Sequence, residues 1–141
     1  MQNLTLRASG AQTAASETAT INTPSNFTDA TFILDVTALA TQTADHLDVY
    51  IDVTPDDGST WLNAIHFTQQ DGDGSAAKYV AKLSKGQLLN DPDAELVVTT
   101  DAAESVVRNL FVSGKIRYRG VVAESATDDA SFTYSVTAIF E

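Results

Sequence analysis

The side chains of this sequence best suited to chemistry are two histidines and several closely spaced aspartates. His46 stands beside Asp48 in a segment of alternating residues, and His66 lies in the next apolar segment. A protein zinc site takes three or four His, Cys, Asp or Glu ligands. Because no third ligand accompanies either histidine, we expect no metal site at these residues, and the sequence indicates no cofactor.

The stretch Asp71-Gly72-Asp73-Gly74 supplies oxygen ligands on a polar loop, as the start of a calcium-binding loop does. A calcium loop of the EF-hand type has a Glu at its twelfth position, where this sequence has Lys82. We therefore predict an ordinary hairpin loop, with calcium binding as the open alternative.

Asp56-Asp57 and Asp128-Asp129 are carboxylate pairs of the kind used in general acid–base catalysis. Such catalysis needs a cleft that shifts their pKa values, whereas both pairs lie in predicted turns. Nucleophile-elbow, P-loop and dinucleotide-binding motifs are also missing from the sequence. We therefore expect no catalytic residues and no enzymatic activity.

Two arginines on one face of a predicted strand, Arg117 and Arg119, could contact a partner, because a planar guanidinium pairs well with carboxylates at interfaces. They could equally pair with aspartates of the same sheet. A short alternating segment near the N-terminus could add to a sheet edge. The residues predicted to form a partner interface are Leu4, Leu6, Arg7, Arg117 and Arg119.

The composition narrows the possible classes of protein. The 141 residues suit one domain, and the lack of cysteine excludes disulfides and thiolate metal sites. A net charge of -11 opposes binding to the phosphate backbone, so we expect no direct contact with nucleic acid. No stretch approaches the roughly 18 apolar residues of a membrane span, and no signal peptide is evident. We expect a protein made in the cytoplasm and not bound to a membrane.

Alternation of apolar and polar residues predicts strands along most of the chain. The turn Pro55-Asp56-Asp57-Gly58 predicts a hairpin after one such strand, and Trp61 is expected in the core with Ile65 and Phe67. The predicted strands include the following apolar sets: Phe32, Leu34 and Val36; Leu47, Val49, Ile51 and Val53; Tyr79, Ala81 and Leu83; Ile116 and Tyr118; Phe132, Tyr134, Val136, Ala138 and Phe140.

Other segments are harder to assign. Asp101 to Glu104 match a capping box that could begin a short helix, although Val106 and Val107 could equally form a strand. Further along, Asn90 to Asp93 predict a turn and Leu96 to Val98 a short strand.

Many short strands separated by turns, with no long amphipathic helix, predict an all-β fold: an antiparallel β-sandwich of jelly-roll or immunoglobulin-like type. Residues 1–28 are rich in Ala, Ser and Thr, which predicts an extended, loose N-terminal arm before a sandwich domain at 29–141. Deleting residues 1–20 is then expected to leave the sandwich folded.

Four segments, in this order, resemble a group of small virion proteins of tailed bacteriophages. In sequence order they are Ala30 to Thr37, Leu47 to Trp61, Ile116 to Arg119, and Ser131 to Ala138. The resemblance covers roughly residues 30–141, and the stretch from Lys85 to Gly114 departs from the group's pattern. It implies a β-sandwich mounted on the virion, often as a head-decoration protein.

If the resemblance holds, it implies a homotrimer on the outer surface of the capsid, bound to the major capsid protein. Two alternatives stay open. One is a tail, neck or fibre component of the same virion. The other is a carbohydrate-binding module, which would need Trp61, Tyr50 and Tyr118 to form an exposed aromatic platform.

Overall fold

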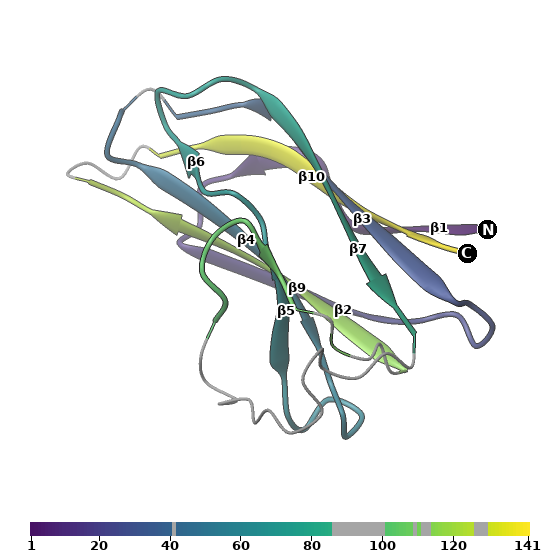
Figure 1. Ribbon diagram of the computed structural model, residues 1–141. Coiled ribbons are helices and arrows are strands. Elements are labelled where there is room, and N and C mark those ends of the chain that lie inside the picture. Colours follow the sequence, from purple (N-terminus) through teal and green to yellow (C-terminus); the bar gives the residue numbers. More distant parts are fainter. Residues whose placement is uncertain (41, 86–100, 109, 111–113, 126–129) are drawn as a thin grey trace.

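The computed structural model describes residues 1–40, 42–85, 101–108, 110, 114–125 and 130–141. These residues form two antiparallel sheets packed face to face (Figure 1). Sheet A contains, in spatial order, β1 (Gln2–Gln12), β10 (Phe132–Phe140), β3 (Asp29–Ala38) and β7 (Ala77–Ser84). Sheet B contains β2 (Ser16–Asn22), β9 (Lys115–Ala123), β4 (His46–Val53), β5 (Leu62–His66) and β8 (Val106–Val107), and β6 (Gln70–Asp71) also pairs with β4. The predicted all-β sandwich is confirmed.

The strand order identifies the sandwich as a jelly roll. Successive strands alternate between the sheets: β1 and β3 lie in sheet A, whereas β2 and β4 lie in sheet B. An immunoglobulin sandwich instead keeps its first two strands in one sheet. The order β1-β10-β3-β7 facing β2-β9-β4-β5 is that of two wound Greek keys, so the topology decides between the two predicted types.

The central strands show the predicted period of two. Along β3 and β10, every second side chain is buried in the core, and the alternate ones face outward from sheet A. In sheet B the same alternation buries one side of β9 and the first half of β4. Because neighbouring strands are in register, these inward sets form one continuous apolar core.

The N-terminal segment is extended, as predicted, but it is not loose. Its first half, β1, pairs with β10, and its second half, β2, pairs with β9, so the segment supplies one edge strand to each sheet. Leu6 and Gln12 are 5% and 0% exposed. The predicted boundary at residue 28 therefore does not separate an arm from the sandwich, because residues 1–28 bury side chains in the same core.

The hairpin between β4 and β5 contains the predicted Asp-Gly turn. Asp57 and Gly58 have φ values of 58° and 103°, and the Thr54 hydroxyl accepts a hydrogen bond from the Gly58 amide at 2.8 Å. A bulge then shifts the register between β4 and β5. Because of this bulge, Trp61 does not share the inward face of Ile65: it is only half-buried and lies beside Arg117 on the outer face.

The segment 101–108 contains no helix, so the capping-box interpretation is wrong and the strand alternative holds for Val106–Val107. The predicted turn at Asn90 to Asp93 and the strand at Leu96 to Val98 lie outside the described residues. Within the described part of the chain, no helix is long and apolar enough to cross a membrane.

A buried polar contact joins the two sheets. The hydroxyls of Tyr118 on β9 and Tyr134 on β10 are hydrogen-bonded to each other, and the Tyr134 hydroxyl donates to Gln12 Oε1. Gln12 Nε2 in turn donates to the backbone carbonyls of Ala14 and Gly120. Burial raises the pKa of Tyr118 to about 12 and also raises the pKa of Tyr134, which keeps both phenols neutral.

Deleting residues 1–20 should destabilise the sandwich, because it removes the buried Leu6 and Gln12 and strips a strand from each sheet. We expect a loss of about 3 kcal/mol or more in the free energy of unfolding, measured in urea. Deletion of the exposed Met1 alone is the control and should change little. An unchanged urea midpoint of unfolding after deletion of residues 1–20 would show that these residues do not support the core.

Gly120→Ala should also be destabilising, because a Cβ at this position would collide with the Tyr118 hydroxyl, the Tyr134 hydroxyl and Gln12 Oε1. The expected cost is about 1–3 kcal/mol, as for other overpacked sites. Gly114→Ala is a matched control, since no atom lies within 4 Å of a Cβ built there. Equal melting temperatures for the two variants would contradict the tight fit around Gly120.

Candidate interaction surface

Arg117 and Arg119 meet at a single carboxylate, that of Asp52. Arg117 donates to Asp52 Oδ2 from Nε at 2.9 Å and from Nη2 at 2.8 Å. Arg119 donates to Oδ2 from Nε at 2.7 Å and to Oδ1 from Nη2 at 3.1 Å. The Asp52 side chain is 1% exposed. Of the two interpretations left open by the sequence, pairing within the sheet is therefore the one observed.

The two guanidiniums also cover aromatic rings on the outer face of sheet B. Arg119 lies 4.4 Å from the ring centre of Tyr50, and Arg117 lies 4.7 Å from that of Trp61. Burial alone would lower the pKa of Arg119, but hydrogen bonds to Asp52 and Asp101 outweigh it and raise the pKa. Arg119 therefore remains charged at every accessible pH.

His66 extends the network to the other side of Tyr50. Its Nε2 lies 2.8 Å from Asp48 Oδ1, and its ring stacks on Tyr50 with 4.2 Å between centres. Gln69 donates two further hydrogen bonds to Asp48. Burial, followed by the negative charge of Asp48, raises the pKa of Tyr50 to about 12.

The segment from Asp101 to Ser105 closes over β5 from outside. The Ala102 amide donates to Asn63 Oδ1 at 2.9 Å, and the Ala102 carbonyl lies 2.9 Å from His66 Nδ1. Asn63 Nδ2 also donates to Asp52 Oδ1 at 3.1 Å. Strand β5 is therefore covered on both faces. These hydrogen bonds hold the segment from Asp101 to Ser105 in place.

Leu4, Leu6 and Arg7 are also engaged within the chain. Leu6 is buried, and Leu4 packs against the core. Arg7, with a side chain 10% exposed, donates to Glu17 Oε2 at 2.8 Å and to the Tyr134 carbonyl, which joins the edge strands of the two sheets. These side chains therefore make contacts within the chain, and their role in a partner interface stays a prediction.

The histidines and the remaining aspartates do not converge. His46 Nδ1 lies 3.0 Å from Asp71 Oδ1, whereas His66 Nε2 contacts Asp48 Oδ1 at 2.8 Å. Asp56 caps its own turn by accepting a hydrogen bond from the Thr60 amide at 2.6 Å, which lowers its pKa. Asp128 and Asp129 lie outside the described residues. In the described part of the chain, no three His, Cys, Asp or Glu side chains are grouped so that they could hold a metal ion.

The aromatic platform required for sugar binding is not formed. Tyr118 is 1% exposed and points into the core, on the opposite face of sheet B from Tyr50. The rings of Tyr50 and Trp61 are covered by arginines, so they do not present a continuous face to a sugar ring.

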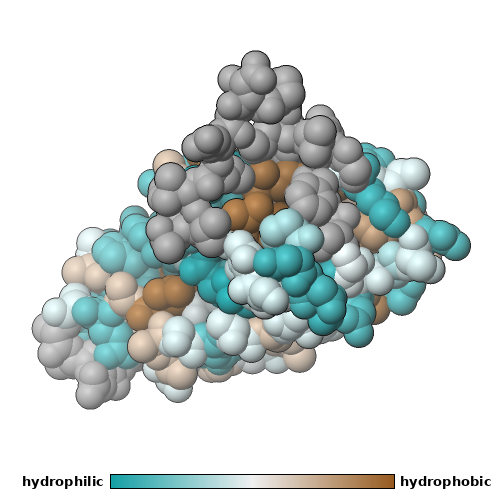
Figure 2. All heavy atoms as spheres, turned by 90° about the horizontal axis from the view of Figure 1, so that it is seen from below, coloured by the Kyte–Doolittle hydropathy of each residue, from teal (hydrophilic) through white to brown (hydrophobic). Residues whose placement is uncertain are grey.

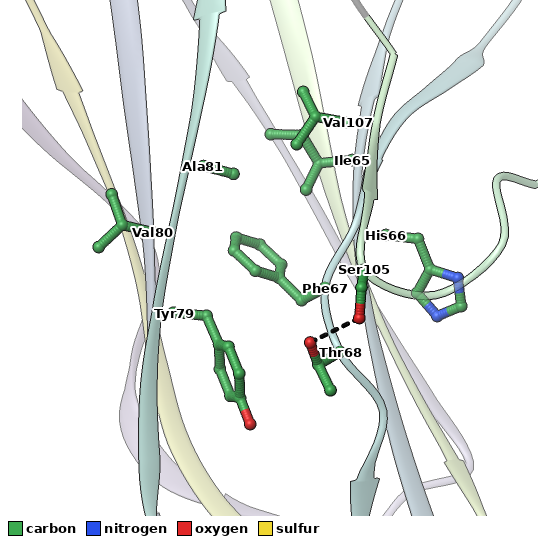
Figure 3. Close-up of a pocket in the computed structure, with 9 residues that line it drawn as sticks. All are labelled: Ile65, His66, Phe67, Thr68, Tyr79, Val80, Ala81, Ser105 and Val107. Atoms are coloured by element: carbon green, nitrogen blue, oxygen red, sulfur yellow. Dashed lines mark hydrogen bonds between the residues drawn. The ribbon is translucent and has the colours of Figure 1, made fainter.

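A small pocket of about 140 Å³ lies between β7 and the segment containing β5 and β8 (Figure 3). Phe67, Tyr79 and Ile65 point into it, and a hydrogen bond of 2.8 Å joins the hydroxyls of Thr68 and Ser105 at its rim. His66 points away, toward the outer-face network. The pocket is smaller than the roughly 300 Å³ minimum typical of small-molecule sites, so it does not define a ligand site.

Few large apolar side chains are exposed among the described residues. The face in Figure 2 is largely hydrophilic, with apolar atoms gathered in small areas. The exposed large apolar side chains among the described residues are Met1, Val80, Val106 and Val107.

The described residues thus form a jelly-roll sandwich. On the outer face of sheet B, the charged side chains described above are hydrogen-bonded to other groups of the same chain. Comparison with known proteins adds no family: no family model matches this chain, and no curated protein matches it significantly.

Asp52→Asn should be more damaging than loss of an exposed ion pair, because it leaves Arg117 and Arg119 without their shared charge. We expect the free energy of unfolding to fall by about 2 kcal/mol or more. Lys78→Gln, which breaks the exposed pair of Lys78 with Asp35, should cost less than about 1 kcal/mol. Urea unfolding compares the two variants, and equal losses would show that the Asp52 network adds no special stability.

Proposed function

We propose that the protein is a structural component of a tailed-bacteriophage virion, namely a head-decoration protein that binds the outer surface of the capsid lattice. The observation that carries the proposal is the place of the four resembling segments. They supply β3 and β10 at the centre of sheet A, and β4 and β9 at the centre of sheet B. The resemblance thus rests on the framework of the fold.

The jelly roll is compatible with this role without proving it. Viral capsid proteins, lectins and cupins all use the fold, so topology alone does not choose among them. The covered rings of Tyr50 and Trp61 weigh against the lectin-like alternative, and the dispersed carboxylates weigh against an enzyme.

A decoration protein needs a stable body and a repeated contact, because many weak contacts on a lattice add up through multivalency. The internally paired charges on both sheets fit such a body. The proposed partners are the major capsid protein and further copies of this chain, arranged as a trimer that covers exposed edge strands. The protein would be made in the host cytoplasm and incorporated on the capsid surface.

The proposal predicts that purified protein forms a trimer by light scattering and pellets with capsids of its own phage that lack decoration. Binding should saturate at a fixed number of copies per capsid. Isolated tails of the same phage are the comparison sample. A monomer that ignores capsids would overturn the decoration role, and pelleting with tails alone would assign it to the tail.

Two single-charge variants refine this experiment. Val80→Glu places a charge on the outer side of sheet A, and Thr18→Glu places one on the outer side of sheet B; both positions are exposed. If one sheet faces the lattice, one variant should lose pelleting while the other behaves as wild type. Unchanged melting temperatures establish that neither variant acts through misfolding.

A further inference from the structure

One end of the sandwich gathers the connections β3–β4, β6–β7 and β9–β10, and Asp45 lies at their junction. Its amide donates to the Gln42 carbonyl at 3.1 Å, and its own carbonyl accepts from the Gly72 amide at 2.8 Å. Asp45 is 1% exposed. The backbone therefore fixes a carboxylate in the interior of a loop junction.

The two oxygens of this carboxylate differ. Asp45 Oδ1 accepts hydrogen bonds from the Ser125 amide at 2.9 Å and from the Ser125 hydroxyl at 3.0 Å. Asp45 Oδ2 has no partner, and it is the single buried side-chain nitrogen or oxygen in that condition among the described residues. Buried polar groups are almost always satisfied, so an orphaned carboxylate oxygen points to an ion or water at this place.

No positively charged Lys or Arg side chain comes from the described connections around Asp45. The described connecting residues at this end, 13–15, 39–40, 42–45, 72–76 and 124–125, contain no Lys or Arg. His46 is the nearest basic residue in sequence, and it contacts Asp71. Asp73 and Glu124 add further negative charge at this end. A buried carboxylate without a counter-charge is strongly unfavourable, which favours capture of a cation over a water molecule.

Neutral oxygen atoms lie close to the same carboxylate. The Ser125 hydroxyl oxygen is 3.0 Å from Asp45 Oδ1 and 3.3 Å from Gln42 Oε1. Carboxylate, amide and water oxygens are the ligands that Ca²⁺ accepts in irregular geometry. Since no three acidic or histidine side chains gather among the described residues, neutral oxygens must complete the coordination shell.

We propose that Asp45 is the anchoring ligand of a divalent cation site of the calcium class, completed by Gln42 Oε1, neighbouring oxygens and water. The bound ion neutralises the buried carboxylate and ties the β3–β4 connection to the β9–β10 connection. The Asp71 loop, which carries the calcium-like sequence, serves as a support: its Gly72 amide holds the Asp45 backbone.

The test is thermal unfolding of the full chain, stripped with EDTA and then titrated with CaCl₂ from micromolar to millimolar concentration at constant ionic strength. Binding to the native state should raise the melting temperature in a saturable way. Isothermal titration with Ca²⁺ should give one site per chain. Asp45→Asn should abolish both signals, whereas Asp56→Asn, in an exposed turn at the opposite end, should keep them.

Three results would overturn the proposal: a wild-type chain that does not respond to Ca²⁺, a shift that persists in Asp45→Asn, or an Asp45→Asn chain that is more stable than wild type at every Ca²⁺ concentration. The last result would show that the native fold does not need the negative charge of Asp45. If Asp45→Asn fails to fold, Gln42→Ala takes its place. It should weaken Ca²⁺ binding by roughly tenfold, and unchanged affinity would count against the site.

Discussion

The hydrogen bond between the hydroxyls of Tyr118 and Tyr134 crosses the layer of side chains that separates the two sheets. Each phenol is buried and would lose a partner if the sheets moved apart, so the bond sets their spacing at the level of Gly120. Gln12 completes the arrangement from the end of β1. The central strands and the N-terminal segment are thus mutually dependent, which explains why the segment behaves as part of the sandwich.

Charge is distributed unevenly over this framework. The basic residues on the strands are matched to carboxylates: Arg7 with Glu17, Lys78 with Asp35, Lys82 with Asp29, Lys115 with Asp57, and Arg117 and Arg119 with Asp52. Other acidic residues, such as Asp73 and Glu124, lie in connections. Each lysine or arginine on a strand is thus neutralised by a carboxylate of the same chain.

The sequence predicted the positions of the strands far better than the contacts between side chains on different strands. Alternation along β3, β4, β9 and β10 depends on burial of one strand face, a local property that survives in a single sequence. The joint pairing of Arg117 and Arg119 with Asp52 depends on which strands are neighbours, and no local pattern encodes that choice. Trp61 was misplaced because one bulge inverts the alternation between it and Ile65.

The low apolar content of residues 1–28 suggested a loose arm, yet edge strands need only one half-buried face. The burial of Asp45 could not be predicted from the sequence for a related reason. Nothing in its immediate sequence distinguishes it from the exposed aspartates, and its burial arises only where three connections distant in sequence come together.

The position of β10 between β1 and β3 has a consequence during synthesis on the ribosome. Strand β1 is made well before its partner β10, so sheet A cannot assemble around its central strand until residues 132–140 have emerged. The nascent chain therefore carries an unpaired strand edge while the residues between β1 and β10 are made. Folding of this jelly roll is expected to be a late, concerted event, and crowded polysomes are where its chains run the greatest risk of pairing with the wrong neighbour.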